Sequence, residues 1–263
     1  MQLDLSGRHA LVCGASQGIG RASALELAGL GASVTLLARS AEALRELADE
    51  LPRRHPGQRH DWRSADMLDT VALHDSVATL AANAPVQILV NNTGGPPGGP
   101  AHAAAPEAFE TAFRQHLLAG QTLVQVLLPG MRAAGYGRIV NVVSTSVKEP
   151  IAGLGVSNTV RAAVAGWAKT LAGELAADGI TVNNVLPGYT RTARLDDILA
   201  ARTRASGRDE DAVTRDMLAS VPARRFGEPE EVAAVIVFLC TPAAGYVNGT
   251  SIAVDGGRTR ALS

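Results

Sequence analysis

A glycine-rich turn near the N-terminus places the strongest limit on what this chain can fold into. Residues 13–20 read Cys-Gly-Ala-Ser-Gln-Gly-Ile-Gly, between an apolar run at 9–13 and a helical pattern at 20–30. Glycine lets the backbone turn tightly and approach a pyrophosphate, and the N-terminus of the helix offers unpaired N–H groups to that anion. Because the motif has the required order of strand, turn and helix, it predicts a dinucleotide site at Gly14, Gly18 and Gly20 rather than a turn that binds no ligand.

Short apolar runs alternate with longer helical patterns along the rest of the chain. Strands are expected at residues 9–13, 33–38, 60–65, 86–90, 137–143, 180–186 and 251–254, and helices at 20–30, 41–51, 69–82, within 105–134, and at 154–177 and 230–239. Ser40 is placed to cap the second of these helices. The apolar runs lack polar alternation, which is typical of strands buried on both faces. The sequence therefore predicts an α/β fold in which residues 1–263 form a single-domain, doubly wound parallel sheet, Rossmann-like, with helices on both faces.

Composition excludes several classes of partner. Of the 263 residues 46% are hydrophobic, enough for one sizeable core, and the net charge is −1. This balance gives no electrostatic reason to bind nucleic acid or a membrane surface. The two cysteines imply no disulfide framework, and the N-terminus lacks the pattern of a signal peptide, so we expect a cytoplasmic protein. The histidines show no metal-ligand spacing, and no metal is expected.

The end of the second predicted strand indicates which cofactor fits. An acidic residue there would accept hydrogen bonds from the adenosine ribose and favour NAD(H), whereas a basic residue suits a 2′-phosphate. This chain has Arg39 and Ser40 at that point and no acid, which favours NADP(H) over NAD(H). Asp66 and Met67 follow the third strand and are placed to contact the adenine. The alternatives are a solvated Arg39 and an Asp66 that serves only as a charge at a helix N-terminus.

Five motifs in this order resemble the short-chain dehydrogenase/reductase family, most closely its 3-oxoacyl-acyl-carrier-protein reductase-like branch. They are the glycines of 14–20, Asn91-Asn92-Thr93-Gly94 after the fourth strand, Ser144 after the fifth, Pro187-Gly188 after the sixth, and Asp255-Gly256-Gly257 near the C-terminus. The resemblance covers nearly the whole chain. It implies hydride transfer between a nicotinamide and a carbonyl or secondary alcohol of a small molecule, in a protein that is usually a homotetramer.

The resemblance also implies a catalytic tetrad, and this chain departs from it. The family's catalytic tyrosine lies thirteen residues after its serine, and its lysine follows four residues later. Those positions hold Ser157 and Arg161, while Ser144 is retained. The family's relay asparagine falls at His116. The chain is therefore identified as a member of a divergent subgroup that lacks the Tyr-x-x-x-Lys pair.

These substitutions change the acid–base chemistry that the family implies. A phenol with a pKa of about 10 can serve as a tuned acid, whereas the hydroxyl of Ser157 is far less acidic. Arg161 can hold ribose hydroxyls but cannot pass a proton onward at working pH. The proton then comes from His116, from Tyr189 after the sixth strand, or from an ordered water relayed through Ser144 and Ser157. As an alternative use, the planar fork of Arg161 could grip a substrate carboxylate.

The sequence thus predicts an NAD(P)(H)-dependent oxidoreductase with an altered general acid, or, as the alternative, an NADP-binding pseudoenzyme that acts as a sensor or scaffold. The expected catalytic residues are Ser144, Ser157, Arg161 and His116. The expected cofactor-binding residues are Gly14, Ser16, Gln17, Gly18, Ile19, Gly20, Arg39, Ser40, Asp66, Met67, Asn92, Gly94, Arg161, Pro187, Gly188, Thr190 and Thr192. The charged stretch 191–226 is expected to form a helical flap over the substrate, with Arg202, Arg204 and Arg208 solvated on it or, alternatively, in contact with an acidic carrier or phosphate.

Overall fold

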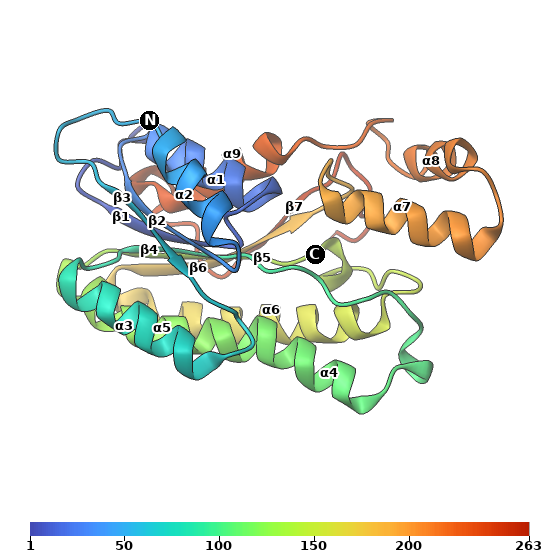
Figure 1. The fold of residues 1–263 in the computed structure, drawn as a ribbon, viewed down its shortest axis with the longest axis horizontal. Coiled ribbons are helices and arrows are strands. Elements are labelled where there is room, and N and C mark those ends of the chain that lie inside the picture. The colour runs from blue at the N-terminus through green and yellow to red at the C-terminus, as the bar shows by residue number, and fades with distance from the viewer. Residues whose placement is uncertain (263) are drawn as a thin grey trace.

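Seven parallel strands, most of them apolar in sequence, form one sheet (Figure 1). The computed structural model describes residues 1–262. The strands are β1 (His9–Cys13), β2 (Ser33–Ala38), β3 (His60–Ser64), β4 (Ile88–Asn91), β5 (Gly137–Val142), β6 (Ile180–Pro187) and β7 (Ser251–Val254). Their order across the sheet is β3-β2-β1-β4-β5-β6-β7, and every pairing is parallel. The doubly wound parallel sheet predicted from the sequence is therefore confirmed.

Helices cover both faces of the sheet. They are α1 (Gly18–Gly29), α2 (Ala41–Glu50), α3 (Thr70–Asn83), α4 (Pro106–Phe113), α5 (Ala119–Ala134), α6 (Gly155–Leu175), α7 (Ala193–Ser206), α8 (Glu210–Ala219) and α9 (Pro229–Cys240). Helices α1, α2 and α9 lie on one face, and α3, α5 and α6 lie on the other (Figure 1). The predicted ends of the strands, and of the helices outside 105–134, differ from the observed ones by no more than two residues.

Each central strand is buried because its side chains enter two cores in turn. In β1, Ala10 and Val12 pack in the cluster formed with α1, α2 and α9, while Leu11 and Cys13 pack in the cluster formed with α3, α5 and α6. All four side chains are fully buried. A strand covered on both faces has no polar side, which explains the uninterrupted apolar runs in the sequence.

The helix predicted within residues 105–134 differs from the expectation. It is interrupted by a π-helical turn at Arg114–Leu118, which separates α4 from α5. Such turns widen a helix by one residue and occur often at functional sites. The turn carries His116, whose side chain is buried.

Strand order reverses direction between β1 and β4, and this determines where a ligand can bind. Chain crossovers leave β1 toward β2 and β3 on one side, and β4 to β7 continue on the other. A crevice opens at such a switch point, beyond the carboxyl ends of the strands. Helices α7 and α8, in the segment that the sequence predicts as a flap, project past this end of the sheet (Figure 1). They form a small core of their own around Leu195, Leu199, Val213, Met217 and Phe226.

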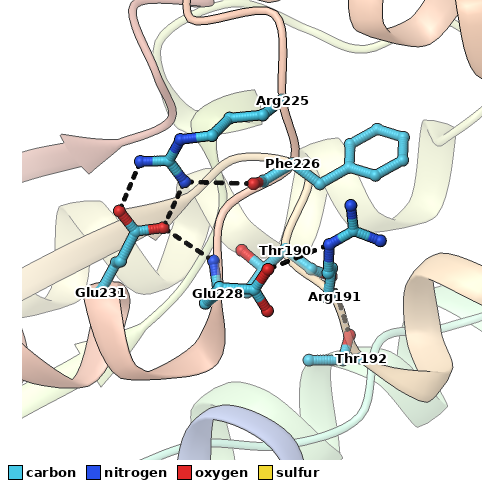
Figure 2. Close-up of polar contacts among 7 residues, drawn as sticks. All are labelled: Thr190, Arg191, Thr192, Arg225, Phe226, Glu228 and Glu231. Atoms are coloured by element: carbon cyan, nitrogen blue, oxygen red, sulfur yellow. Dashed lines mark hydrogen bonds and ion pairs between the residues drawn. The ribbon is translucent and has the colours of Figure 1, made fainter.

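Two ion pairs hold the base of the flap. Thr190, which follows β6, forms a parallel bridge with Gly227, which precedes α9. Glu231, on the first turn of α9, accepts hydrogen bonds from both terminal nitrogens of Arg225 and from the backbone N–H of Glu228 (Figure 2). Arg191 contacts the carboxylate of Glu228 at 3.0 Å. We call these segments, 190–192 and 225–231, the flap stem.

Candidate active site

A cavity of about 860 Å³ occupies the switch point. Its walls come from the turns after β1, β2, β3, β4, β5 and β6, from the first turns of α6, and from α7 of the flap. Of the residues that the sequence analysis assigned to the cofactor, all except Gly20 line this cavity. So do Ser144, Ser157 and Arg161, whereas His116 does not. One continuous space thus joins the glycine turn to the altered catalytic positions.

The glycine turn needs glycine for reasons that the backbone shows directly. Gly14 and Gly18 have φ of +59° and +55°, a region that residues with a Cβ rarely adopt. A Cβ on Gly14 would lie 2.6 Å from the carbonyl oxygen of Asn92, and one on Gly20 would overlap the carbonyl of Gly14. Gly20 therefore does not face the cavity but lets α1 pack against the turn. Gln17 is the N-cap residue of α1, and its side chain accepts no hydrogen bond from the helix. The first N–H groups of α1 therefore stay available to a pyrophosphate.

The adenosine end of the cavity carries a cation where an acid would select NAD(H). Arg39 and Ser40 follow β2 and line the cavity, and the side chain of Ser40 also caps α2. Arg39 is exposed, and within residues 1–262 it pairs with no carboxylate. Asp66 follows β3 and lines the same cavity, and its carboxylate accepts a hydrogen bond from the N–H of Leu68. The residues present fit a 2′-phosphorylated adenosine at this end.

Ser144, Ser157 and Arg161 meet at the other end of the cavity. Ser144 follows β5, and its hydroxyl accepts a hydrogen bond from the N–H of Ser146 at 3.1 Å. Ser157 and Arg161 are one turn apart on α6, and both are 8% exposed. The guanidinium of Arg161 donates to the carbonyl of Val142 at 2.7 Å. Burial, with a smaller contribution from the charge of Arg194, lowers the pKa of Arg161 to about 10, so it remains a cation at neutral pH.

His116 lies outside the large cavity, next to Arg161. Its Nδ1 contacts the hydroxyl of Thr93. The ring lines a second cavity, of about 10 Å³, together with Asn91 and Arg161. Burial, and to a lesser degree Arg161, lowers the pKa of His116 to about 2. The imidazole is therefore neutral at physiological pH and holds no readily released second proton.

Arginines that the sequence analysis did not assign to the site line its flap side. Arg194 donates to the carbonyl of Pro96 at 2.8 Å, and Arg202 donates to the hydroxyl of Tyr189 at 3.1 Å. Arg258 lies over the Tyr189 ring, with its guanidinium carbon 4.7 Å from the ring centre. The expectation of a solvated Arg202 was wrong, because this side chain is half-buried against the cavity while Arg204 and Arg208 stay exposed.

The spacing of Arg194 and Arg202 in the sequence indicates that they share one face of a helix. Arg194, Ile198 and Arg202 recur at intervals of four residues along α7, so they share one helical face, and all three line the cavity. Arg258 follows the C-terminal glycines and had no such signal. Among residues 1–262 no group of three or more histidine, cysteine or acidic side chains is placed to hold a metal. Within the same residues, no helix has the length and apolarity needed to cross a membrane.

Comparison with known proteins gives consistent matches over nearly the whole chain. A family model described as Enoyl-(Acyl carrier protein) reductase matches residues 14–259. The 2-dehydro-3-deoxy-D-gluconate 5-dehydrogenase of Bacillus subtilis is 34% identical over 260 residues, which are 96% of this chain and 95% of that protein. The 3-oxoacyl-[acyl-carrier-protein] reductase of Vibrio harveyi is 32% identical over 258 residues, 97% and 98% of the two chains. The crystal structure of L-sorbose reductase from Gluconobacter frateurii, complexed with NADPH and L-sorbose, superposes with a TM-score of 0.91 at 32% identity and covers 100% of both chains.

Proposed function

The chain belongs to the short-chain dehydrogenase/reductase family, and we propose that the cavity at its sheet switch point is the active site of a carbonyl reductase or alcohol dehydrogenase with an altered proton donor. The protein is an NAD(P)-dependent oxidoreductase, and its relatives are dehydrogenases and reductases of small molecules. No observation favours a non-catalytic sensor or scaffold. The observation that carries the proposal is the continuity of one cavity from the glycine turn to Ser144 and Arg161.

The cofactor is NADP(H) in preference to NAD(H), as in the related reductase with bound NADPH. The glycine turn and the N-terminus of α1 would hold the pyrophosphate, and Arg39 with Ser40 would hold the 2′-phosphate. Arg161 would bind the hydroxyls of the nicotinamide ribose with a charge that persists at neutral pH. When bound, the nicotinamide supplies or accepts the hydride at the carbon of a carbonyl or secondary alcohol.

The remaining residues bind the substrate oxygen and supply the proton. Ser144 would donate a hydrogen bond to the carbonyl oxygen, which holds it in place and stabilises its developing charge. Ser157 is too weak an acid to donate the proton, and His116 is neutral and lies outside the large cavity. Of the three tyrosines, all of them described, Tyr189 lines the cavity, while Tyr136 is buried elsewhere and Tyr246 is exposed. We assign proton donation to the phenol of Tyr189.

Turnover with NADPH tests this proposal. The purified protein should oxidise NADPH in the presence of a panel of ketones and aldehydes, and Tyr189→Phe should lower kcat by about 100- to 10,000-fold, the usual cost of losing a positioned acid. Binding of NADPH, measured by fluorescence titration, should not change. Tyr246→Phe, on the surface, is the matched control. Undiminished turnover by Tyr189→Phe would assign the proton to water relayed through the two serines, and no turnover of any carbonyl by the wild type would overturn the proposed function.

We further propose that residues 1–263 act as one domain with 191–226 as its flap, in a cytoplasmic homo-oligomer. The resemblance to the family supports a tetramer. Both cysteines are buried free thiols, which suits a reducing compartment. Light scattering of the purified protein measures the number of subunits directly.

A further inference from the structure

The flap side of the cavity holds more cationic side chains than hydride transfer to a neutral ketone needs. Arg194, Arg202 and Arg258 all line it. Across the part of the chain that the structure describes, none of the three lies within 4.0 Å of a carboxylate. The chain has 25 acidic and 24 basic residues, so this excess is local. At this end the lining includes one acid, Asp197, which is exposed on α7.

Arg258 is the most constrained of the three. It donates to the hydroxyl of Thr145 at 3.3 Å, and its guanidinium rests on the ring of Tyr189. Its Nε is buried and has no acceptor among residues 1–262. A buried charged donor without an acceptor is costly, so a site of this kind is built for an anion that completes it. Thr145 directly follows Ser144, which places this anion close to the substrate carbonyl.

Arg202 approaches the same tyrosine from the flap. Its guanidinium carbon is 5.6 Å from the centre of the Tyr189 ring, and its one hydrogen bond in the described chain goes to the phenol oxygen. A guanidinium has five N–H donors in a planar fork, so most of those on Arg202 remain available. Tyr189 therefore contacts two arginines from different segments, one from α7 and one from the C-terminal segment.

We propose that the substrate is a small oxo acid, or the corresponding hydroxy acid, whose carboxylate is bound by Arg258 and Arg202. The planar fork of arginine matches the two oxygens of a carboxylate. Because Arg258 contacts the residue after Ser144, the carboxylate lies within a few bonds of the reacting carbonyl. A carrier-bound oxoacyl thioester has no anion near its carbonyl and would leave both guanidinium groups without a partner. This inference rests on the proposed function and specifies its substrate class.

Matched acids and esters test the inference without a mutation. The probes are 2-oxobutanoate, acetoacetate and 4-oxopentanoate, each compared with its methyl ester, in the presence of NADPH. The ester keeps the carbonyl and removes the charge. We expect at least one acid to be reduced with a kcat/KM about 100-fold above that of its ester, the value of a charge-assisted bidentate contact. Equal values for every acid and its ester, with turnover present, overturn the inference and leave the proposed function standing.

Variants then locate the carboxylate site. Because both arginines also contact Tyr189, the test is the ratio of acid to ester. Arg258→Gln and Arg202→Gln should each lower kcat/KM for the preferred acid about 10- to 100-fold more than for its ester, with the difference mainly in KM. Arg204→Gln is the matched control, because Arg204 is exposed on the same helix and does not line the cavity. An equal loss for acid and ester in both variants would mean a purely structural role and would overturn the assignment.

Binding to the cofactor-loaded protein separates this inference from the proposed function. If no carbonyl is reduced, calorimetric titration of 2-hydroxybutanoate, 3-hydroxybutanoate and 4-hydroxypentanoate into the protein saturated with NADP⁺ still reports on the carboxylate site. Binding by the wild type that Arg258→Gln weakens at least tenfold, while Arg204→Gln does not, supports the site. Absence of binding of all three acids overturns it.

Discussion

At the scale of single residues, Arg39 makes the choice of cofactor testable. Arg39→Asp replaces a cation beside the expected 2′-phosphate with an acid that can accept the ribose hydroxyls of NADH. We expect kcat/KM for NADPH to fall about 10- to 100-fold, because a charge-assisted contact is lost and a repulsion is added. We expect kcat/KM for NADH to rise. Steady-state kinetics with both cofactors and one substrate measure the ratio.

Arg45→Asp provides the control for this change. Arg45 is exposed on α2 and does not line the cavity, so the same reversal of charge should leave the cofactor ratio unaltered. If both variants shift the ratio equally, net charge rather than a contact by Arg39 governs the preference.

The positions of some site residues could be predicted from the sequence, and those of others could not. Gly14 and Gly18 could be placed because a backbone requirement fixes both the residue type and the spacing. Arg258 could not be placed, because its position in the cavity depends on a contact with Thr145, which is 113 residues earlier in the chain. His116 was placed near the reaction centre, but burial, which lowers its pKa, is a property of the folded chain.

At the scale of elements, local periodicity predicted the strands and most helices but not the interruption between α4 and α5. Apolar residues identify β1 and most of β2 because both faces of these strands are buried, whereas β6 also buries the polar residues Thr181, Asn183 and Asn184. The π-helical turn at Arg114–Leu118 adds one residue to a helical turn, and the hydrophobic pattern on either side stays compatible with one continuous helix. Its position is fixed by tertiary contacts such as that between His116 and Thr93.

The stability of the flap stem should fall at low pH. Glu231 binds Arg225 and the N–H of Glu228 only as a carboxylate, and these contacts lower its pKa to about 2, from an ordinary 4.5. A carboxyl with a depressed pKa in the folded state contributes stability above the ordinary value and loses it as pH falls toward the depressed value. The stem should therefore loosen between about pH 4.5 and pH 2.

Glu231→Gln should reproduce this loosening at neutral pH. We expect faster hydrogen exchange at the amides of Arg191 and Gly227, which bond across the stem. Mass-spectrometric exchange of peptides over 186–195 and 222–232 gives the measurement. Glu230→Gln is the matched control, because Glu230 is the exposed neighbour of Glu231 and makes no ion pair within the described chain. Exchange that is equally fast in both variants would argue against a role for the Arg225–Glu231 pair.

At the scale of the whole molecule, the cavity exists because elements far apart in sequence converge on one end of the sheet. The turns after β1 and β2 line the proposed cofactor side, and α6 with the turn after β5 lines the proposed reaction centre. Helix α7 and the C-terminal segment supply the arginines. The fold thus builds the cofactor half from local motifs and the substrate half from long-range contacts. This division explains why the sequence predicted NADP(H) but not the substrate class.

The free energy of unfolding of the whole protein should depend on pH because of His116. Burial lowers the pKa of this imidazole to about 2 in the folded protein, while the unfolded chain titrates near 6.5. Below pH 6.5 the unfolded state binds a proton that the folded state does not. The contribution of His116 to the free energy of unfolding is therefore fully present above pH 6.5 and is lost as the pH is lowered. For one such group the loss is about 1.4 kcal/mol per pH unit.

His116→Asn removes this titration while keeping a polar side chain beside Thr93. Denaturant unfolding between pH 6.5 and 4.5 should then show a slope of stability against pH that is shallower than the wild type by about 1.4 kcal/mol per unit. Some slope remains in both proteins, because burial also lowers the pKa of His9 and of His60. His102→Asn, at an exposed position, should keep the wild-type slope. Parallel curves for His116→Asn and the wild type would mean that the folded protein admits a proton to this ring, and His116 would then return as a proton donor for the reaction.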